Sequence, residues 1–309
     1  MFVLEYIWLD SDHEFRSKTR LSSVISAWNF DGSSTGQATT DESEIILRPV
    51  YSCENPFKYI DGYKCMLVLC ETWIDDHTPH STNTRTATLH IFEKYKDQIP
   101  LFGLEQEFFL KLPSPELCKP GKSNFYCKHN HATGRECVEE IFDKCVRAGL
   151  GITGMNAEVA PYQWELQVCE YGVKAADQLI MMRYIMDRVS KKHNYNIILH
   201  PKPYKHCNGS GCHVNFSTES IRNGDCDIEY IMDKFSAKHG EHLAVYGGKN
   251  HLRLTGTNET SDIERFTWGR GDRTASIRCN NGYFEDRRPA SDIDPYIVTS
   301  KILETLCDV

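Results

Sequence analysis

The chain has 309 residues, of which 40% are hydrophobic and 25% charged, enough for one large globular domain or two unequal ones. Its net charge of -8 argues against a general nucleic-acid-binding protein. No apolar run approaches the roughly 20 residues of a membrane span, and the N-terminus lacks a basic-then-apolar signal pattern, so we expect a cytoplasmic protein. The thirteen cysteines are irregularly spaced, which predicts reduced, mostly packed thiols rather than a disulfide framework.

The N-terminal part of the chain has the pattern of short strands. Apolar residues alternate in four places, namely residues 2–9, the segment after the turn at residues 11–13, residues 45–50 and residues 64–70. The segment WNFDGSSTGQ (residues 28–37) is a polar loop, which either carries a site or is a capped turn with solvated hydroxyls. Residues 79–83 have the composition of a linker. We therefore expect a small β-rich domain over residues 1–83.

From residue 84 onward, predicted strands are interleaved with amphipathic helices. Helical periodicity or capping residues mark four segments: residues 135–150, residues 176–193, the segment after the N-cap Asp227 and the segment after Asp294-Pro295. These helices have the pattern of scaffold elements. Residues 84–309 are therefore predicted to form a larger α+β domain.

The segment GLEQEFFL (residues 103–110) places carboxylates on a strand that should be half-buried. Side chains alternate along a strand, so Glu105 and Glu107 share one face about 7 Å apart, while Phe108 and Leu110 take the other. Two anions this close repel each other unless a cation lies between them, which suggests a metal site with oxygen ligands. The alternative is an amphipathic strand with a solvated acidic face.

Other predicted strands also carry polar side chains at every second position. Residues 211–217 place His213, Asn215 and Ser217 on one face. Further strands contribute glutamate, arginine and tyrosine side chains: Glu158 (residues 156–159), Glu165 (163–168), Arg273 and Arg278 (273–278), and Tyr283, Glu285 and Arg287 (282–289). A lone histidine on a strand is more often a core residue than a ligand. Several strands that present Glu, His and Arg together favour one large sheet with a functional face.

These residue types also limit the chemistry. Five glutamates and one imidazole suit Mg²⁺ or Mn²⁺, and arginines near them suit phosphate and carboxylate groups. Without an obvious nucleophile, the set favours phosphoryl transfer assisted by charge neutralisation. The chain has neither a GxxxxGK[ST] motif nor a GxGxxG motif after a strand, so a nucleotide would bind outside those folds.

In this order, the motifs closely resemble those of glutamine synthetases of the eukaryotic (type II) kind. The match covers nearly the whole chain: WNFDGSSTGQ (28–37), EQE (105–107), NAEV (156–159), NGSGCH (208–213), RLTG (253–256), ASIR (275–278) and YFEDRRP (283–289). The resemblance implies an α+β fold with a small β-grasp-like N-terminal domain and a larger catalytic domain, built on a curved antiparallel sheet with helices. It also implies a double-ring homo-decamer with active sites between subunits.

The resemblance implies a role for each matching residue. One metal ion would be held by Glu107, Glu158 and Glu165, and a second, which bridges the ATP phosphates, by Glu105, His213 and Glu285. Glutamate would be bound by Asn208, Gly209, Arg253 and Arg287. ATP would be contacted by His213, Asn215, Ser217, Arg273, Arg278 and Tyr283, of which the two arginines neutralise phosphate charge. Asp31, assisted by Ser34, would take a proton from ammonium, and Glu259 would be the flap residue that keeps water from the intermediate.

The activity implied is the ATP-dependent ligation of ammonia to L-glutamate through γ-glutamyl phosphate, with two or three Mg²⁺ or Mn²⁺ ions per site. One alternative is a related γ-glutamyl ligase that uses a larger amine. Another is a catalytically silent structural protein on the same fold. No nucleic acid or membrane is expected as a partner.

The sequence also departs from the type II pattern. It is short at both ends, is compressed over residues 112–126, and has only residues 279–282 between Arg278 and Tyr283, where the family has a longer basic loop. Asn258 replaces the usual His, and Cys207 replaces a Trp. A separate group of residues suits zinc by type but not by spacing, and ordinary thiols with surface histidines are the alternative: Cys118, Cys127, His129, His131 and Cys137.

Overall fold

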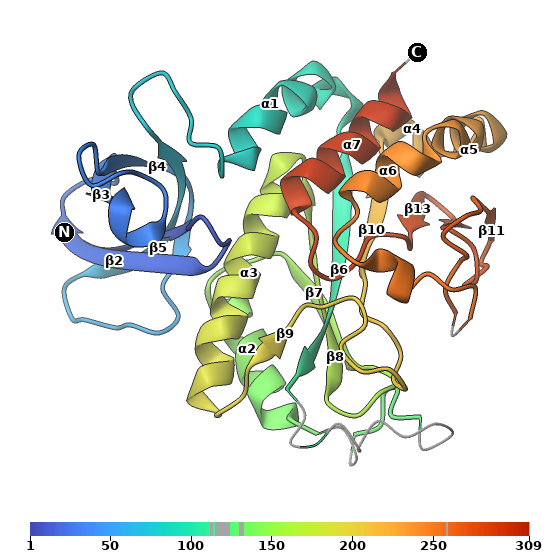
Figure 1. Ribbon diagram of the computed structural model, residues 1–309, viewed down its shortest axis with the longest axis horizontal. Helices are drawn as coiled ribbons and strands as arrows, with labels where there is room; N and C mark the ends of the chain where they lie inside the picture. Colours follow the sequence, from blue (N-terminus) through green and yellow to red (C-terminus); the bar gives the residue numbers. More distant parts are fainter. Residues whose placement is uncertain (112–113, 115–123, 130–132, 258, 309) are drawn as a thin grey trace. The chain divides into compact units, whose positions relative to one another are not determined.

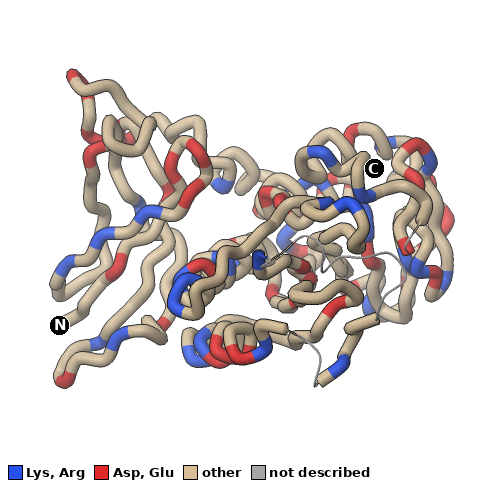
Figure 2. The backbone as a smooth tube through the Cα atoms, turned by 60° about the horizontal axis from the view of Figure 1, so that its bottom comes forward, with Lys and Arg blue, Asp and Glu red and all other residues tan. Residues whose placement is uncertain are grey.

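The structure is a computed structural model that describes residues 1–111, 114, 124–129, 133–257 and 259–308 (Figure 1). It divides into two compact units, one made of Met1–His90 and Asp143–Leu150 and the other of Ile91–Phe142 and Gly151–Val309. Lys, Arg, Asp and Glu residues are interspersed along the chain of both units (Figure 2). None of the helices in the described part of the chain has the length and apolar character needed to cross a bilayer.

The first unit is built on a five-stranded sheet with the order β2-β1-β5-β4-β3. Its strands are β1 (Phe2–Leu9), β2 (Phe15–Ser22), β3 (Trp28–Asp31), β4 (Glu44–Glu54) and β5 (Lys64–Trp73). Strands β1 and β5 are parallel, and the other pairs are antiparallel. The four predicted strands are confirmed.

Strand β3 corrects the prediction of a loop over residues 28–37. Its residue Phe30 is buried and packs on Trp8, with ring centroids 4.4 Å apart, so an apolar anchor holds this segment against β4. The remainder forms a 3₁₀ helix, η1 (Gly32–Thr35), which begins at Asp31. The polar loop expected from the sequence is therefore shorter than predicted.

The second unit contains an eight-stranded sheet that runs β11-β12-β13-β10-β6-β8-β7, with β9 also paired to β6. Its strands are β6 (Leu101–Leu110), β7 (Ile152–Ala157), β8 (Gln163–Tyr171), β9 (Ile197–Ile198), β10 (Cys212–Ser217), β11 (Trp268–Arg270), β12 (Ile277–Asn280) and β13 (Tyr283–Asp286). All pairs are antiparallel except β11 with β12. The expected α+β class is confirmed.

The helices are α1 (Thr84–Lys94), α2 (Arg135–Arg147), α3 (Val173–Lys192), α4 (Glu219–Asn223), α5 (Ile228–Ala237), α6 (His239–Val245) and α7 (Pro295–Cys307). The four predicted helices correspond to α2, α3, α5 and α7. Asp227 and Asp294 cap α5 and α7 as expected, since their carboxylates accept hydrogen bonds from backbone N–H groups in the first turn. The long α3 packs against β6 and β8, on one face of the large sheet (Figure 1).

Alternation along the central strands separates the packed face of this sheet from a polar face. On β6, Phe108 and Leu110 are fully buried, and on β10 Val214 is as well. The predicted strand over residues 273–278 is wrong in its first four residues, because β12 begins only at Ile277. Glu158 lies just after the end of β7 rather than within it.

Candidate active site

The polar face of the large sheet is assembled by the register of five neighbouring strands. Glu107 of β6 lies opposite Glu165 of β8, and Glu105 of β6 lies opposite His213 of β10. On the next pair of strands, Arg278 of β12 lies opposite Glu285 of β13. Side chains of directly opposed residues are neighbours about 5 Å apart at Cβ. The register alone therefore brings residues that are far apart in the sequence into one cluster.

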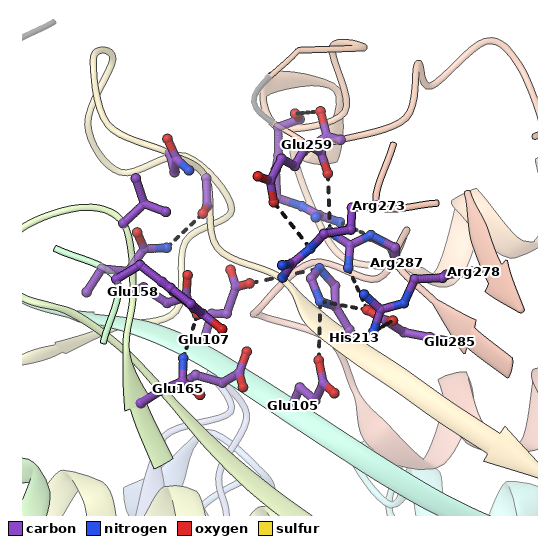
Figure 3. A pocket seen from close by; sticks show the side chains of 18 of the residues that line it. Glu105, Glu107, Glu158, Glu165, His213, Glu259, Arg273, Arg278, Glu285 and Arg287 are labelled. Carbon is purple, nitrogen blue, oxygen red and sulfur yellow. Dashed lines mark hydrogen bonds and ion pairs between the residues drawn. The ribbon is translucent and has the colours of Figure 1, made fainter. Parts of the chain in front are cut away.

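One group of possible metal ligands consists of Glu105, His213 and Glu285, whose ligand atoms lie within 4.8 Å of one another (Figure 3). We call it the arginine-paired triad. His213 Nδ1 lies 3.5 Å from Glu105 Oε2 and 3.6 Å from Glu285 Oε1. Arg278 Nη2 and Arg287 Nη1 each lie 2.6 Å from one oxygen of Glu285. This triad is therefore surrounded by positive charge from the protein itself.

Glu105 in this triad is held in its ionised form. Burial alone would raise the pKa of Glu105, but the hydrogen bond and charge of His213 and the amide of Asn215 lower it below the usual value. Asn215 Nδ2 donates to Glu105 Oε1 over 2.7 Å. Asn215 thus acts on the carboxylate from the neighbouring strand, although it does not line the pocket.

A second group consists of Glu107, Glu158 and Glu165, whose ligand atoms also lie within 4.8 Å of one another. We call it the carboxylate triad. Burial raises the pKa of Glu158 to about 8, helped by the charge of Glu107. Burial also raises the pKa of Glu165 to about 9, helped by Glu105, Glu107 and Glu158. These carboxylates cannot all ionise together without a cation among them.

Neighbouring amides orient the oxygens of the carboxylate triad. Glu107 Oε2 accepts a hydrogen bond from the backbone N–H of Gly211 at 2.7 Å. Asn156 Nδ2 donates to Glu158 at 2.8 Å, and Gln167 Nε2 donates to Glu165 at 2.5 Å. Both triads offer hard ligands, five carboxylates and one imidazole in all, which fit Mg²⁺ or Mn²⁺. The mutual repulsion of the carboxylates is a further sign that a cation belongs there.

The two triads open into one pocket, which contains most of the residues predicted to bind substrate. Arg253 is only 4% exposed, and burial lowers its pKa to about 10 despite the opposing effect of Glu107. Asn208 and Gly209 line the same pocket. An anionic substrate in this pocket would thus meet both arginines and the two triads.

Glu259 lies at the edge of this pocket on a strained stretch of backbone. Its φ angle is +59°, a region that residues with a side chain seldom occupy. Arg273 Nε lies 3.4 Å from its carboxylate, and Arg287 Nη2 donates to its carbonyl oxygen at 3.2 Å. Figure 3 shows Glu259, Arg273 and Arg287 across the pocket from Glu158 and Glu165.

Comparison with known proteins identifies the chain's relatives. Residues 87–225 match the family model of the glutamine synthetase catalytic domain. The chain is 42% identical to a putative glutamine synthetase of Acanthamoeba polyphaga mimivirus, in an alignment that covers 99% of this chain and 94% of the relative. It is 43% identical to the glutamine synthetase of Tuber borchii, with 99% and 92% covered, and 42% identical to that of Schizosaccharomyces pombe, with 98% and 91% covered. The chain belongs to the glutamine synthetase family.

This member of the glutamine synthetase family is compact. The alignments with the mimivirus and Tuber borchii relatives span 337 and 340 positions, more than the 309 residues of the chain, so the relatives carry insertions. The predicted short connection after Arg278 is a tight hairpin, in which Asn280 pairs with Tyr283 and Gly282 has a φ angle of +80°. Glycine adopts this conformation at little cost. Asn258, a further predicted departure, lies outside the described residues.

Five predicted site residues do not line the pocket, and Asn215 is one of them. Ser217 lies at the end of β10, where its hydroxyl oxygen accepts a hydrogen bond from Arg222, and Tyr283 is 38% exposed in the hairpin. Asp31 and Ser34 belong to the first unit. There the Asp31 carboxylate accepts hydrogen bonds from both Ser33 and Ser34, which lower its pKa.

Other pocket residues were missed by the sequence analysis, namely Tyr126, Asn156, Gln163, Gln167 and Thr260. Gln163 and Gln167 lie on β8 two residues on either side of Glu165, so strict strand alternation could have identified them. Asn156 is two residues before Glu158, and its role in the site is apparent only from the hydrogen bond that its amide donates to Glu158. Tyr126 lies in a segment with no periodic pattern.

The cysteines differ from the prediction at one position. Eleven described cysteines are free thiols, most of them buried or half-buried, whereas Cys207 is disulfide-bonded. Spacing along the chain does not show which Cβ atoms come within bonding distance. Of the residues considered for zinc, Cys118 and His131 lie outside the described residues. Cys137 is buried on α2, where burial raises its pKa to about 12.

Proposed function

We propose that this protein is a glutamate–ammonia ligase, which uses ATP to convert L-glutamate and ammonia into L-glutamine, ADP and phosphate through γ-glutamyl phosphate. The observation that carries the proposal is the pairing of two ligand triads with Arg278, Arg287 and Arg253 in one pocket, in a chain of the glutamine synthetase family. A catalytically silent protein would gain nothing from buried carboxylates that repel one another. The silent alternative is therefore disfavoured.

We propose that the pocket binds Mg²⁺ or Mn²⁺, two or three ions per site. The carboxylate triad would hold one ion and the arginine-paired triad another. Bound cations would reduce the repulsion between the γ-carboxylate of glutamate and the ATP phosphates. Because Glu158 and Glu165 have raised pKa values, their oxygens become ligands only after losing protons.

The arginines would stabilise the negative charge on the transferred phosphoryl group. Arg278 and Arg287 are oriented by their ion pairs with Glu285, so their remaining N–H groups need no rearrangement to meet a phosphate. Arg273 would act from the same side of the pocket as Arg287, next to Glu259. In this arrangement Glu259 covers the acyl phosphate and excludes water, which would otherwise hydrolyse it.

The substrates would occupy different parts of the second unit. Glutamate would bind through Arg253, Arg287, Asn208 and Gly209, all of which line the pocket. ATP would contact a second set of residues: His213, Asn215, Ser217, Arg273, Arg278 and Tyr283. Residues 84–309 would thus form the catalytic domain, and residues 1–83 the N-terminal domain.

Ammonium would be deprotonated by Asp31, assisted by Ser34. The low pKa of Asp31 keeps this carboxylate ionised and able to attract ammonium. We propose that the segment with Asp31 and Ser34 is supplied to each pocket by a neighbouring copy of the chain, in a homo-oligomer with active sites between subunits. In such a ring, each Asp31 would serve the pocket of an adjacent subunit.

The test is phosphate release from ATP with Mg²⁺ or Mn²⁺, with glutamate present and with ammonium added or withheld. Ammonium-dependent release together with glutamine formation is expected. Glutamate-dependent release that yields another γ-glutamyl amide in a screen of amines would instead support the larger-amine ligase. No release with either metal would contradict both and favour the silent protein.

A further inference from the structure

Arg253 is a buried cation whose hydrogen-bond donors are mostly used by the protein. Its Nη2 donates to the carbonyl oxygens of Arg287 (3.1 Å), Arg288 (2.6 Å) and Pro289 (3.0 Å). Its Nε donates to Asn250 Oδ1 at 3.1 Å. Among the described residues, no carboxylate forms an ion pair with this guanidinium. Its charge is therefore solvated by neutral dipoles, and carboxylates such as Glu107 act on it only without direct contact.

The surroundings leave one end of the guanidinium facing the pocket. A Cβ atom on Gly209 would lie 2.4 Å from Arg253 Cγ and 2.6 Å from the carbonyl oxygen of Pro201, so the arginine stem packs directly on glycine backbone. A Cβ on Gly211 would lie 3.1 Å from Nη1. Nε and Nη2 donate to the protein, whereas Nη1 makes no hydrogen bond among the described residues, and Arg253 lines the pocket, so Nη1 is the nitrogen left for a ligand.

Asn250 connects this arginine to the segment after β13. It is 5% exposed and is the first residue of the 3₁₀ helix η4 (Asn250–Leu252), which ends just before Arg253. Its Nδ2 donates to the carbonyl oxygens of Tyr246 (3.2 Å) and Arg288 (2.6 Å), which leaves Oδ1 to accept from Arg253. The orientation of the Asn250 amide is therefore fixed, because its NH₂ group faces two carbonyl oxygens, which can only accept hydrogen bonds.

We propose that Asn250 is a positioning residue for the glutamate substrate, which fixes Arg253 so that Nη1 and the positive charge of the guanidinium face the substrate's α-carboxylate. This inference rests on the proposed function. The proposed role requires a neutral amide, because an amide holds the guanidinium in place without neutralising its charge. An aspartate at this position would place a negative charge on Arg253 and an oxygen against the carbonyl of Arg288. Both effects would weaken the attraction for a carboxylate substrate.

Initial rates of glutamine formation test the proposal in wild type, Asn250→Ala, Asn250→Ser and Asn250→Asp, with glutamate and ATP varied separately. Loss of a hydrogen bond to a charged group is expected to raise KM for glutamate about tenfold in the Ala and Ser variants. The Asp variant should show a larger rise. KM for ATP should stay within about twofold in all three.

The matched control is Asn83→Ala, which removes a similarly buried amide from the first unit. Asn83 is 8% exposed, donates to Thr72 O and Thr86 Oγ1, and accepts from the backbone N–H of Thr86. The Asn83→Ala substitution should lower the unfolding temperature as much as Asn250→Ala does and leave the KM values for glutamate and ATP unchanged. The proposal is wrong if the Asn250 variants raise both KM values equally, or if they change stability alone.

The wild-type assay separates this inference from the proposed function. If wild type forms no glutamine, the function fails, and the inference is then tested by the shift in unfolding temperature that glutamate produces. Glutamate should stabilise wild type and Asn83→Ala but not Asn250→Ala. Equal stabilisation of all three proteins would contradict the role of Asn250. If Asn250→Ala does not fold, Asn250→Ser, which keeps a polar side chain, gives the same comparison.

Discussion

The two ligand triads lie on the same sheet face but differ in what balances their charge. The arginine-paired triad has Arg278 and Arg287 within 2.6 Å of Glu285, and His213 beside Glu105. The carboxylate triad has amide and backbone N–H donors, and no described Lys or Arg forms an ion pair with it. Glu105 of the first triad therefore stays ionised without a metal, whereas Glu158 and Glu165 of the second triad hold protons.

This difference suggests a division of labour in the metal-free protein. The arginine-paired triad is already arranged by ion pairs, so a cation there competes with arginine for Glu285. In the carboxylate triad, ionised oxygens repel one another, and a bound cation removes this repulsion. Metal binding to this triad is therefore linked to the loss of its protons. Metal binding should consequently change the charge and stability of the carboxylate triad more than those of its neighbour.

The largest effect is expected from breaking the arginine-paired triad with Glu285→Ala. This change removes a proposed ligand and leaves Arg278 and Arg287 without their buried partner, since Glu285 is 1% exposed. Turnover should fall about a thousandfold or more, and stability by about 3–5 kcal/mol. Steady-state rates and urea unfolding measure both. Glu93→Ala, at an exposed position, is the control. Near-normal turnover in Glu285→Ala would contradict the assignment of this site.

The protons held by the carboxylate triad should make the free energy of unfolding of the metal-free protein depend on pH. Glu165, with a pKa of about 9 against an ordinary value of 4.5, binds its proton more tightly in the folded than in the unfolded state. The free energy of unfolding should therefore decrease as pH rises between these two values, by up to about 1.4 kcal/mol per pH unit. Glu158 should add to this slope up to its pKa of about 8.

Glu165→Gln should make this pH dependence shallower, because glutamine does not titrate. Urea unfolding in the presence of a chelator, from about pH 5.5 to about pH 8.5, measures the slope. Saturating Mn²⁺ should also flatten the slope in wild type, since the cation displaces the protons. An identical slope in wild type and Glu165→Gln would show that Glu165 is ionised in the metal-free protein, and the contrast between the triads would then be wrong.

The sequence predicted the strands of the site better than their arrangement. Alternation on β6 placed Glu105 and Glu107 on one face, and this phase is confirmed because both side chains line the pocket. The phase is a local property, determined by apolar side chains at every second position. Which strands become neighbours is not local: β6 lies between β10 and β8, which follow it in the chain.

The grouping of ligands came from the family resemblance rather than from spacing. The structure brings together the same two sets of residues, with Glu158 contributed from beyond the end of β7. The ion pair of Glu285 with Arg278 had no signal in the sequence, because it depends on the β12–β13 register. Glu285 and Arg287 are two residues apart, so alternation had already placed them on one face. Strand β3 was missed for a related reason, since its buried residue Phe30 packs on Trp8, which is distant in the sequence.

The smallest effect is expected from the amides that orient one carboxylate in each triad. Gln167 is the described side chain that donates to Glu165, whereas Glu105 is held by both Asn215 and His213. Gln167→Ala should therefore weaken Mn²⁺ binding about tenfold, and Asn215→Ala by a smaller factor of about three. Mn²⁺ titrations followed by electron paramagnetic resonance of the free ion measure both affinities, with Asn83→Ala as a control that contacts neither triad. An equal loss in the two variants would mean that His213 contributes nothing to the alignment of Glu105, so that the two triads would differ only in their protonation.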